Sequence, residues 1–88
     1  MKIVKISSLG CPSCIIMNKV FNKMKEKYSF EWEEYDIDLD YEEVKKYNFN
    51  NKIPTFILYK DDVEVGRIIG EHKEEDFSKM IEENLWKN

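Results

Sequence analysis

Cysteine, proline and glycine are scarce in this chain. It has 88 residues but only two cysteines, two prolines and three glycines. Two cysteines are too few for a secreted scaffold stapled by disulfides. No stretch is rich in glycine or proline, and no internal repeat or low-complexity segment is present. The length suffices for one hydrophobic core, so we expect a single domain over residues 1–88.

Long apolar runs and an excess of positive charge are also missing. No run approaches the roughly 18 apolar residues that a transmembrane helix needs. Lysines interrupt the apolar N-terminus, so we expect no signal peptide. The 14 basic and 18 acidic residues are interspersed and give a net charge of −4, which disfavours nucleic-acid binding. We therefore expect no membrane or nucleic-acid partner, a cytoplasmic location and a monomer.

What the sequence does contain is an alternation of strand and helix patterns. Apolar and β-favouring residues predict strands at residues 2–7, 30–38, 55–60 and 64–69. Helical periodicity predicts helices at residues 12–28, 40–47 and 73–86. In the first helix, Ile16, Val20 and Met24 recur every four residues, joined by the apolar residues Met17, Phe21 and Tyr28. Asp40 is placed to cap the second helix, with Glu43 completing a capping box.

The order of these elements, βαβαββα, predicts an α/β fold. Two strand–helix–strand crossovers, a hairpin and a last helix give a four-stranded mixed sheet with helices on both faces. The handedness of the crossovers places the first and third strands side by side at the centre. The Asp61–Asp62 pair predicts the hairpin turn between the last two strands.

The two cysteines form a Cys-Pro-Ser-Cys sequence, the cysteine motif, made of Cys11, Pro12, Ser13 and Cys14. It follows the first strand, at the end where ligands approach such sheets. Proline is favoured at the first helical position, so Cys11 is expected at the N-cap, where the helix dipole favours a thiolate. Cys14 lies one turn further on the same side. The motif therefore predicts a reactive Cys11 and a resolving Cys14.

Two other interpretations of the cysteines were weighed. The pair could be buried and structural. A zinc site needs four ligands, whereas the chain offers these two cysteines and the distant His72. We expect no metal and no cofactor beyond the cysteine pair. A metal or iron–sulfur site shared between two copies stays open as an alternative.

Pro54 stands just before the apolar strand at residues 55–60. Proline donates no ladder hydrogen bond, so it is unusual at the mouth of a central strand. The residues themselves slightly favour a proline that simply begins a strand. The other interpretation is a cis proline that presents the backbone of Ile53 beside the cysteines.

Nearly the whole chain resembles the thioredoxin superfamily. The resemblance rests on the strand and helix around the cysteine motif and on two further segments. One runs from Tyr35 to Asp38, where two aspartates alternate with β-favouring residues, and the other runs from Ile53 to Lys60. Gly70 also follows Pro54 at the family's spacing. The resemblance implies a minimal thioredoxin fold in which Pro54 is cis and lies against the cysteines. It further implies an active site with the following members: Cys11 and Cys14 as catalytic residues, Pro12, Ser13 and Pro54 as their support, and Gly10, Ile53, Thr55 and Gly70 as the substrate-binding groove.

The sequence departs from the thioredoxin pattern at Lys5. Thioredoxins carry a buried acid there, six residues before the first cysteine, which assists deprotonation of the resolving thiol. The proton acceptor for Cys14 is therefore unassigned. The short length and the Pro12–Ser13 pair are similar to glutaredoxins instead, but Gly70 stands alone where glutaredoxins have two glycines for binding glutathione.

These observations predict a thiol–disulfide oxidoreductase that acts as a protein-disulfide reductase. Its expected partners are disulfide-containing proteins and an electron donor, either a thioredoxin-reductase-like enzyme or glutathione. The alternatives are a glutaredoxin-type, glutathione-dependent reductase and a non-catalytic binding module with a thioredoxin fold.

Overall fold

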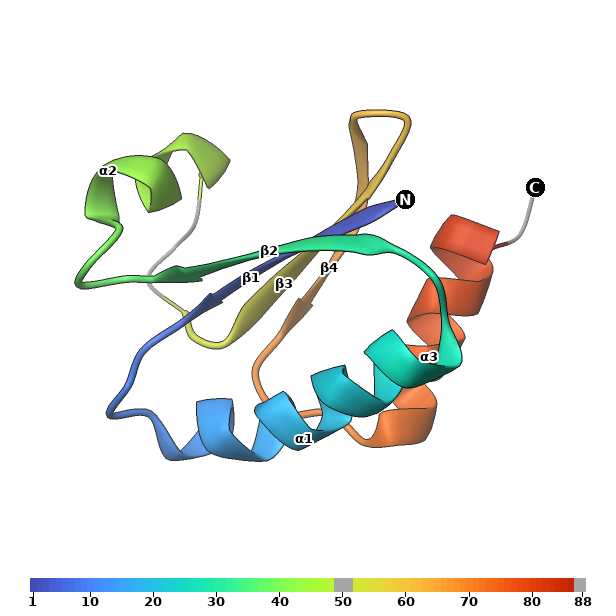
Figure 1. The fold of residues 1–88 in the computed structure, drawn as a ribbon, viewed down its shortest axis with the longest axis horizontal. Helices are drawn as coiled ribbons and strands as arrows, with labels where there is room; N and C mark the ends of the chain where they lie inside the picture. The colour runs from blue at the N-terminus through green and yellow to red at the C-terminus, as the bar shows by residue number, and fades with distance from the viewer. Residues whose placement is uncertain (49–51, 87–88) are drawn as a thin grey trace.

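The chain folds into one sheet flanked by helices (Figure 1). The computed structural model describes residues 1–48 and 52–86. The elements in chain order are β1 (Lys2–Ser7), α1 (Pro12–Lys27), β2 (Glu31–Asp36), α2 (Tyr41–Val44), the 3-10 turn η1 (Lys45–Tyr47), β3 (Thr55–Lys60), β4 (Val63–Ile69), α3 (Glu74–Ile81) and the π-helical segment η2 (Glu82–Trp86). In the part of the chain described, no helix is long and apolar enough to cross a membrane.

The sheet has the strand order β2-β1-β3-β4. The mixed four-stranded sheet and its central first and third strands are therefore confirmed. Strand β1 runs parallel to β2 and antiparallel to β3, and β3 forms an antiparallel hairpin with β4. One expectation was wrong. Only β1–α1–β2 is a parallel crossover, because the connection through α2 brings β3 back in the opposite direction.

Helices cover both faces of the sheet, as predicted, and each face has its own core (Figure 1). Helices α1 and α3 cover one face, where Phe21 lies 5.2 Å from Phe56, and Phe56 lies 4.9 Å from Phe77, measured between ring centroids. The other face buries Val4, Ile6, Val44 and Ile57. Side chains alternate along a strand. The side chain of Lys5 therefore points to the same face as that of Ile3, towards α1.

The buried face of α1 agrees with the predicted apolar set at Met17, Phe21 and Met24 but not at Ile16 and Val20. The buried residues of this helix are Cys14, Met17, Phe21 and Met24. Ile16, in contrast, is 49% exposed, and Val20 is half-buried. Residues four apart drift by about 40° around a helix of 3.6 residues per turn, whereas alternating steps of three and four stay on one line. The buried face therefore includes Cys14.

The turn before α2 also differs from expectation. Asp40 is the N-cap residue, but its side chain caps no amide of α2. Its carboxylate instead accepts a hydrogen bond from the amide of Asp36 at 2.9 Å. The Asp36 carboxylate in turn accepts from the amides of Asp38 and Leu39. These bonds fold residues 36–40 into a turn, which ends β2 at Asp36 and leaves the predicted capping box with Glu43 unformed.

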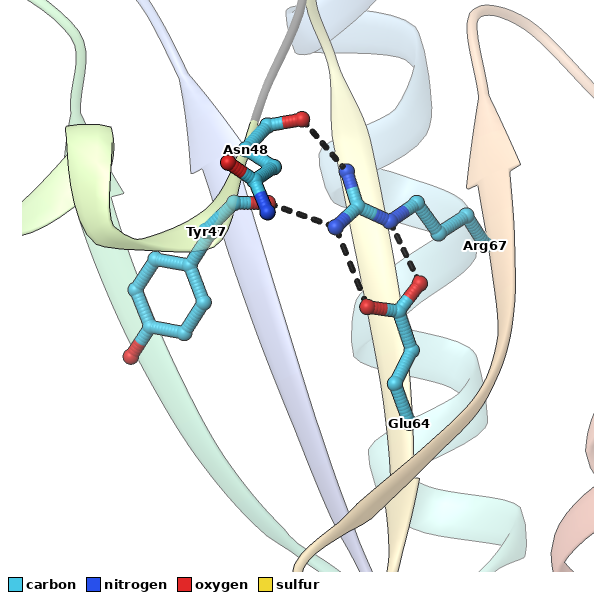
Figure 2. A network of polar contacts seen from close by, with 4 residues as sticks. All are labelled: Tyr47, Asn48, Glu64 and Arg67. Carbon is cyan, nitrogen blue, oxygen red and sulfur yellow. Dashed lines mark hydrogen bonds and ion pairs between the residues drawn. The ribbon is translucent and has the colours of Figure 1, made fainter.

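Arg67 fastens the end of η1 to the sheet (Figure 2). Its guanidinium donates to the carbonyl oxygens of Tyr47 and Asn48 at 2.5 and 3.3 Å. Glu64, on the same strand, accepts from the guanidinium at 2.5 and 3.0 Å and holds it in place. Strand β4 thereby anchors the end of η1, at Tyr47 and Asn48.

Candidate active site

The cysteine motif, Pro54 and Gly70 lie at one end of the sheet. The motif follows the carboxyl end of β1. Thr55, the first residue of β3, pairs with Ile6 in β1, and it also pairs with Ile69, the last residue of β4. The amide of Gly70 donates to the carbonyl oxygen of Pro54 at 2.9 Å. Strand register thus brings together segments that are far apart in the sequence.

Cys11 occupies the N-cap of α1, and Pro12 stands in the first turn. The Cys11 backbone is extended, with φ −99° and ψ 114°, so its side chain folds over the helix end. Its Sγ accepts a hydrogen bond from the amide of Cys14 at 3.1 Å. The amide of Cys14 is one of the free amides that a helix N-terminus presents, and it points at the Cys11 sulfur. Cys11 is half-buried, so it is within reach of a substrate.

Cys14 has a different environment from Cys11. Its side chain is buried, with 2% of the residue exposed. Burial raises the pKa of the Cys14 thiol to about 11, and the hydrogen bond with Cys11 acts in the same direction. A backbone hydrogen bond from Ser8 and the charge of Lys5 lower its pKa by smaller amounts. At neutral pH Cys14 is therefore a protonated thiol beside the accessible Cys11 sulfur.

Ser13 joins the first turn of α1 to the segment after β4. Its hydroxyl donates to the Glu71 carboxylate at 2.8 Å. Glu71 was not among the predicted site residues, although an acid directly after Gly70 was the available signal. Gly70 itself has φ +81°, a conformation that favours glycine. Gly10, directly before the motif, is exposed.

The segment around Pro54 is a tight turn at the start of β3. The Ile53–Pro54 peptide bond is cis in the structure, and Pro54 is buried. The hydroxyl of Thr55 donates to the carbonyl oxygen of Lys52 at 2.5 Å and closes the turn. The side chain of Ile53 packs on the core beneath α2. The buried Thr55 side chain therefore supports the turn from within.

Lys5 lies beneath the motif on the sheet face that α1 covers. Only 9% of its side chain is exposed, and its ammonium donates to the side-chain oxygen of Asn18. The Glu34 carboxylate lies 3.9 Å from the ammonium. Burial lowers the pKa of Lys5, while Glu34 opposes that change. Sequence analysis missed Asn18, which a helical wheel places one turn after Cys14, at the edge of the same face.

Three apolar side chains next to site residues point outward. Leu9 precedes Gly10 and is 84% exposed, Ile15 follows Cys14 and is 59% exposed, and Ile69 precedes Gly70 and is 43% exposed. We call Leu9, Ile15 and Ile69 the apolar rim. Among residues 1–48 and 52–86, no group of three or more His, Cys, Asp or Glu side chains could hold a metal ion.

A pair of cysteines at a helix N-terminus, at the same end of a mixed sheet as a cis-proline turn, defines the thioredoxin-fold class of proteins. The chain belongs to the thioredoxin family, whose family model, described as Thioredoxin, matches residues 1–83. Family and fold together support thiol–disulfide oxidoreductase activity in general. No curated protein sequence matches the chain.

Solved thioredoxins are similar to this structure over most of its length. Thioredoxin NaTrxh from Nicotiana alata is 27% identical with a TM-score of 0.83, and the match covers 94% of this chain and 71% of that one. The reduced thioredoxin pre-protein of Schistosoma mansoni is 27% identical with a TM-score of 0.83, over 96% and 78% of the two chains. Thioredoxin 1 from Thermosipho africanus, at 20% identity, shares the fold with a TM-score of 0.79 over 94% and 92%.

Proposed function

We propose that the protein reduces disulfide bonds in other proteins, with Cys11 as the nucleophile and Cys14 as the resolving thiol. The observation that carries this proposal is the asymmetry of the two sulfurs. Cys11 is accessible at the N-terminus of α1, where its Sγ accepts the Cys14 amide at 3.1 Å. Cys14 is buried one turn away and stays protonated at neutral pH. Such an arrangement favours attack by the first sulfur and intramolecular resolution by the second.

The reaction then has two exchanges. The Cys11 thiolate attacks one sulfur of the substrate disulfide, forms a mixed disulfide and releases the other substrate sulfur as a thiolate, which takes a proton from water. Cys14 then loses its proton and attacks the Cys11 sulfur. The Cys11–Cys14 disulfide forms, and the second substrate sulfur leaves and carries away the proton. Two electrons pass from the dithiol to the substrate.

An extended protein segment is the substrate class that the surroundings of Cys11 favour. The exposed side chains of the apolar rim, which are sequence neighbours of site residues, offer hydrophobic contacts at this end of the molecule. The turn at Ile53 and Pro54 and the backbone of Gly70 lie at the same end of the sheet and form the proposed groove, with Gly10 and Thr55 beside them. Gly70 stands alone where glutaredoxins have two glycines, and the Glu71 carboxylate next to Ser13 repels the net negative charge of glutathione. We therefore place protein disulfides before glutathione as substrates.

The remaining partners belong to the same proposal. A thioredoxin-reductase-like enzyme is the proposed electron donor, and a cytoplasmic monomer is the proposed form. The dithiol state is the working state of a reductase, and a reducing compartment maintains it. Subcellular fractionation of the source cells, with a marker for each compartment, tests the location. Sedimentation of the purified protein tests the oligomeric state.

Cysteine variants test the proposed roles. Insulin reduction by dithiothreitol is followed with catalytic amounts of wild type, Cys11→Ser and Cys14→Ser. We expect Cys11→Ser to be inactive and Cys14→Ser to accumulate a mixed disulfide with insulin, seen by mass spectrometry and removed by excess dithiothreitol. Reduction of insulin by Cys11→Ser at the wild-type rate would refute the assignment of roles.

The electron donor is tested separately, because glutathione is the competing choice. The oxidised protein is mixed with thioredoxin reductase and NADPH, or with glutathione and glutathione reductase. Faster reduction by thioredoxin reductase supports the proposal. Faster reduction by glutathione would instead favour a glutaredoxin-type enzyme. Slow iodoacetamide labelling of Cys11 at neutral pH, or a metal in the purified protein, would favour a non-catalytic module.

A further inference from the structure

The buried lysine beneath the cysteine motif is the feature that the proposed function leaves unused. Lys5 lies on β1, one of the two interior strands, and its neighbours across the sheet are Phe56 on β3 and Glu34 on β2. Its side chain is 9% exposed. A charged group is buried only at a cost, which partners must offset. The position of the ammonium is therefore set by the groups around it.

Those groups lie on the helix face that carries Cys14. The ammonium donates to Asn18, one turn after Cys14 on α1, and lies 5.8 Å from the ring centroid of Phe21, almost one further turn along. Residues 14 and 21 lie on the buried face of α1, and the exposed Asn18 lies at the edge of that face, one turn after Cys14. Cys14 is itself buried on this face. The lysine thus reaches across from the sheet to the face that holds the resolving thiol.

The charges that face the ammonium come from two elements. Glu34 on β2 lies 3.9 Å away, and its carboxylate lies equally close to the ammonium of Lys25 on α1. The positive charge of Lys25 disfavours the protonated form of Lys5. Cys14 is the remaining titratable group that acts on Lys5. Glu34 is half-exposed, so water screens it more than it screens Lys5. The buried Lys5 ammonium is therefore the less screened of the two charges, and it is a cation whose charge acts on Cys14.

We propose that Lys5 is an electrostatic positioning residue for the resolving step, stabilising the thiolate of Cys14 through its buried ammonium. This inference rests on the proposed function, in which Cys14 attacks the mixed disulfide. A carboxylate at this position could accept the proton but would oppose the thiolate by like charge. An ammonium favours the thiolate directly, and the proton leaves on the released substrate sulfur. The direction of its effect agrees, because the charge of Lys5 lowers the pKa of Cys14.

A chromogenic aromatic disulfide separates the two exchanges in one experiment. Reduced protein mixed with a small excess of dithiobis(nitrobenzoate) releases one coloured thiolate when Cys11 attacks and a second when Cys14 resolves. The Cys14→Ser variant gives only the first release and identifies the phases. Stopped-flow traces collected over a range of pH yield the pKa of Cys14 from the second phase alone.

Lys5→Met keeps a side chain of similar length and removes the charge. We expect its second phase to slow by about threefold for each unit by which the pKa of Cys14 rises, because the smaller thiolate fraction is partly offset by higher nucleophilicity. The pH midpoint of the second phase moves upward, whereas the first phase keeps its rate. Lys23→Met, which removes an exposed lysine of α1 paired with Glu74, is the matched control and leaves both phases unchanged.

Glu34→Gln tests the role of Lys5 without changing a buried side chain, and it should shift the midpoint of the second phase in the opposite direction. Removing the carboxylate leaves the Lys5 ammonium less compensated, so the midpoint of the second phase moves downward. A second phase in Lys5→Met with the wild-type rate and midpoint would overturn the role of Lys5. If Lys5→Met does not fold, an unmoved midpoint in Glu34→Gln overturns it instead. Absence of the first phase in the wild-type protein would overturn the proposed function itself.

Discussion

Ser13 and Glu71 are joined by a hydrogen bond of 2.8 Å, although one opens α1 and the other follows β4. This bond places a carboxylate beside the positive end of the helix on which Cys11 sits. Such a helix end attracts anionic substrates. Glu71 therefore opposes the approach of negatively charged disulfides.

Glu71→Gln is expected to speed the attack of Cys11 on anionic disulfides. The amide keeps an oxygen that accepts from Ser13 but removes the charge, so the first phase with dithiobis(nitrobenzoate) should rise about two- to fivefold at low salt, the range typical of an exposed charge at a helix end. Glu74→Gln, which removes an acid paired with Lys23, is the control. An equal gain in both variants would mean that overall charge, and not the position of Glu71, sets the rate.

Arg67→Met is expected to destabilise the protein by about 1 kcal/mol, because it removes charge-assisted hydrogen bonds to two backbone carbonyls at the end of η1. Urea unfolding followed by circular dichroism measures the change. Lys46→Met removes an exposed ion pair with Glu43 and should cost much less stability, because water screens such pairs. If the two variants lose the same stability, Arg67 does not anchor this segment.

Glu33 should make stability depend on pH in the acid range. The hydrogen bond from Tyr35 holds the pKa of Glu33 below its ordinary value of 4.5, and Lys2 acts in the same direction. A depressed pKa stabilises the folded state above the unfolded-state pKa, and this stability is lost as pH falls through the folded-state pKa. Wild type should therefore exceed Glu33→Gln in unfolding free energy at neutral pH, and the difference should vanish in acid.

Urea titrations of wild type and Glu33→Gln from pH 7 downward check this expectation. Glu31→Gln, an exposed substitution on the same strand, is the control. A difference between wild type and Glu33→Gln that stays constant through the acid range would contradict an ionic role for Glu33.

Two substitutions on α1 test which side of this helix is buried. Phe21→Ala should cost about 3–5 kcal/mol, because the ring packs against Phe30, Phe56 and Phe77. Ile16→Ala should change the unfolding free energy by less than about 0.5 kcal/mol, since Ile16 is largely exposed. Comparable losses in thermal or urea unfolding would mean that Ile16 is also buried.

The order of strands and helices could be predicted from the sequence because it depends on local periodicity. Apolar runs identified β1 and β3, and the mixed sheet followed from their order. The buried side of α1 was harder to predict, because Ile16 and Val20 are as apolar as Met17 and Phe21. Contact with the sheet, and not hydrophobicity alone, selects the face that is buried.

The partners of the site residues were the least predictable part. The spacing of Cys11 and Cys14 was enough to predict their place in the site. Glu71 and Asn18 are ordinary surface residue types, and only strand register and helix placement bring them to Ser13 and Lys5. The Asp40 cap failed for a related reason, because the neighbouring turn at Asp36 competes for its carboxylate. Long-range and competing contacts of this kind leave no local pattern in the sequence.

The strand order has a consequence for the order in which the molecule opens. The cysteine motif extends from β1 and the Pro54 turn leads into β3, and these strands are the two interior ones. Interior strands open last, so their amides exchange with solvent deuterium only through near-global unfolding, whereas β2 and β4 exchange through smaller local openings. Local opening of β2 or β4 therefore leaves β1 and β3 paired, and with them the ends of the strands next to Cys11 and Pro54. Opening of β4 would instead release Gly70, whose amide donates to Pro54, so the groove side of the site is less protected than the cysteine side.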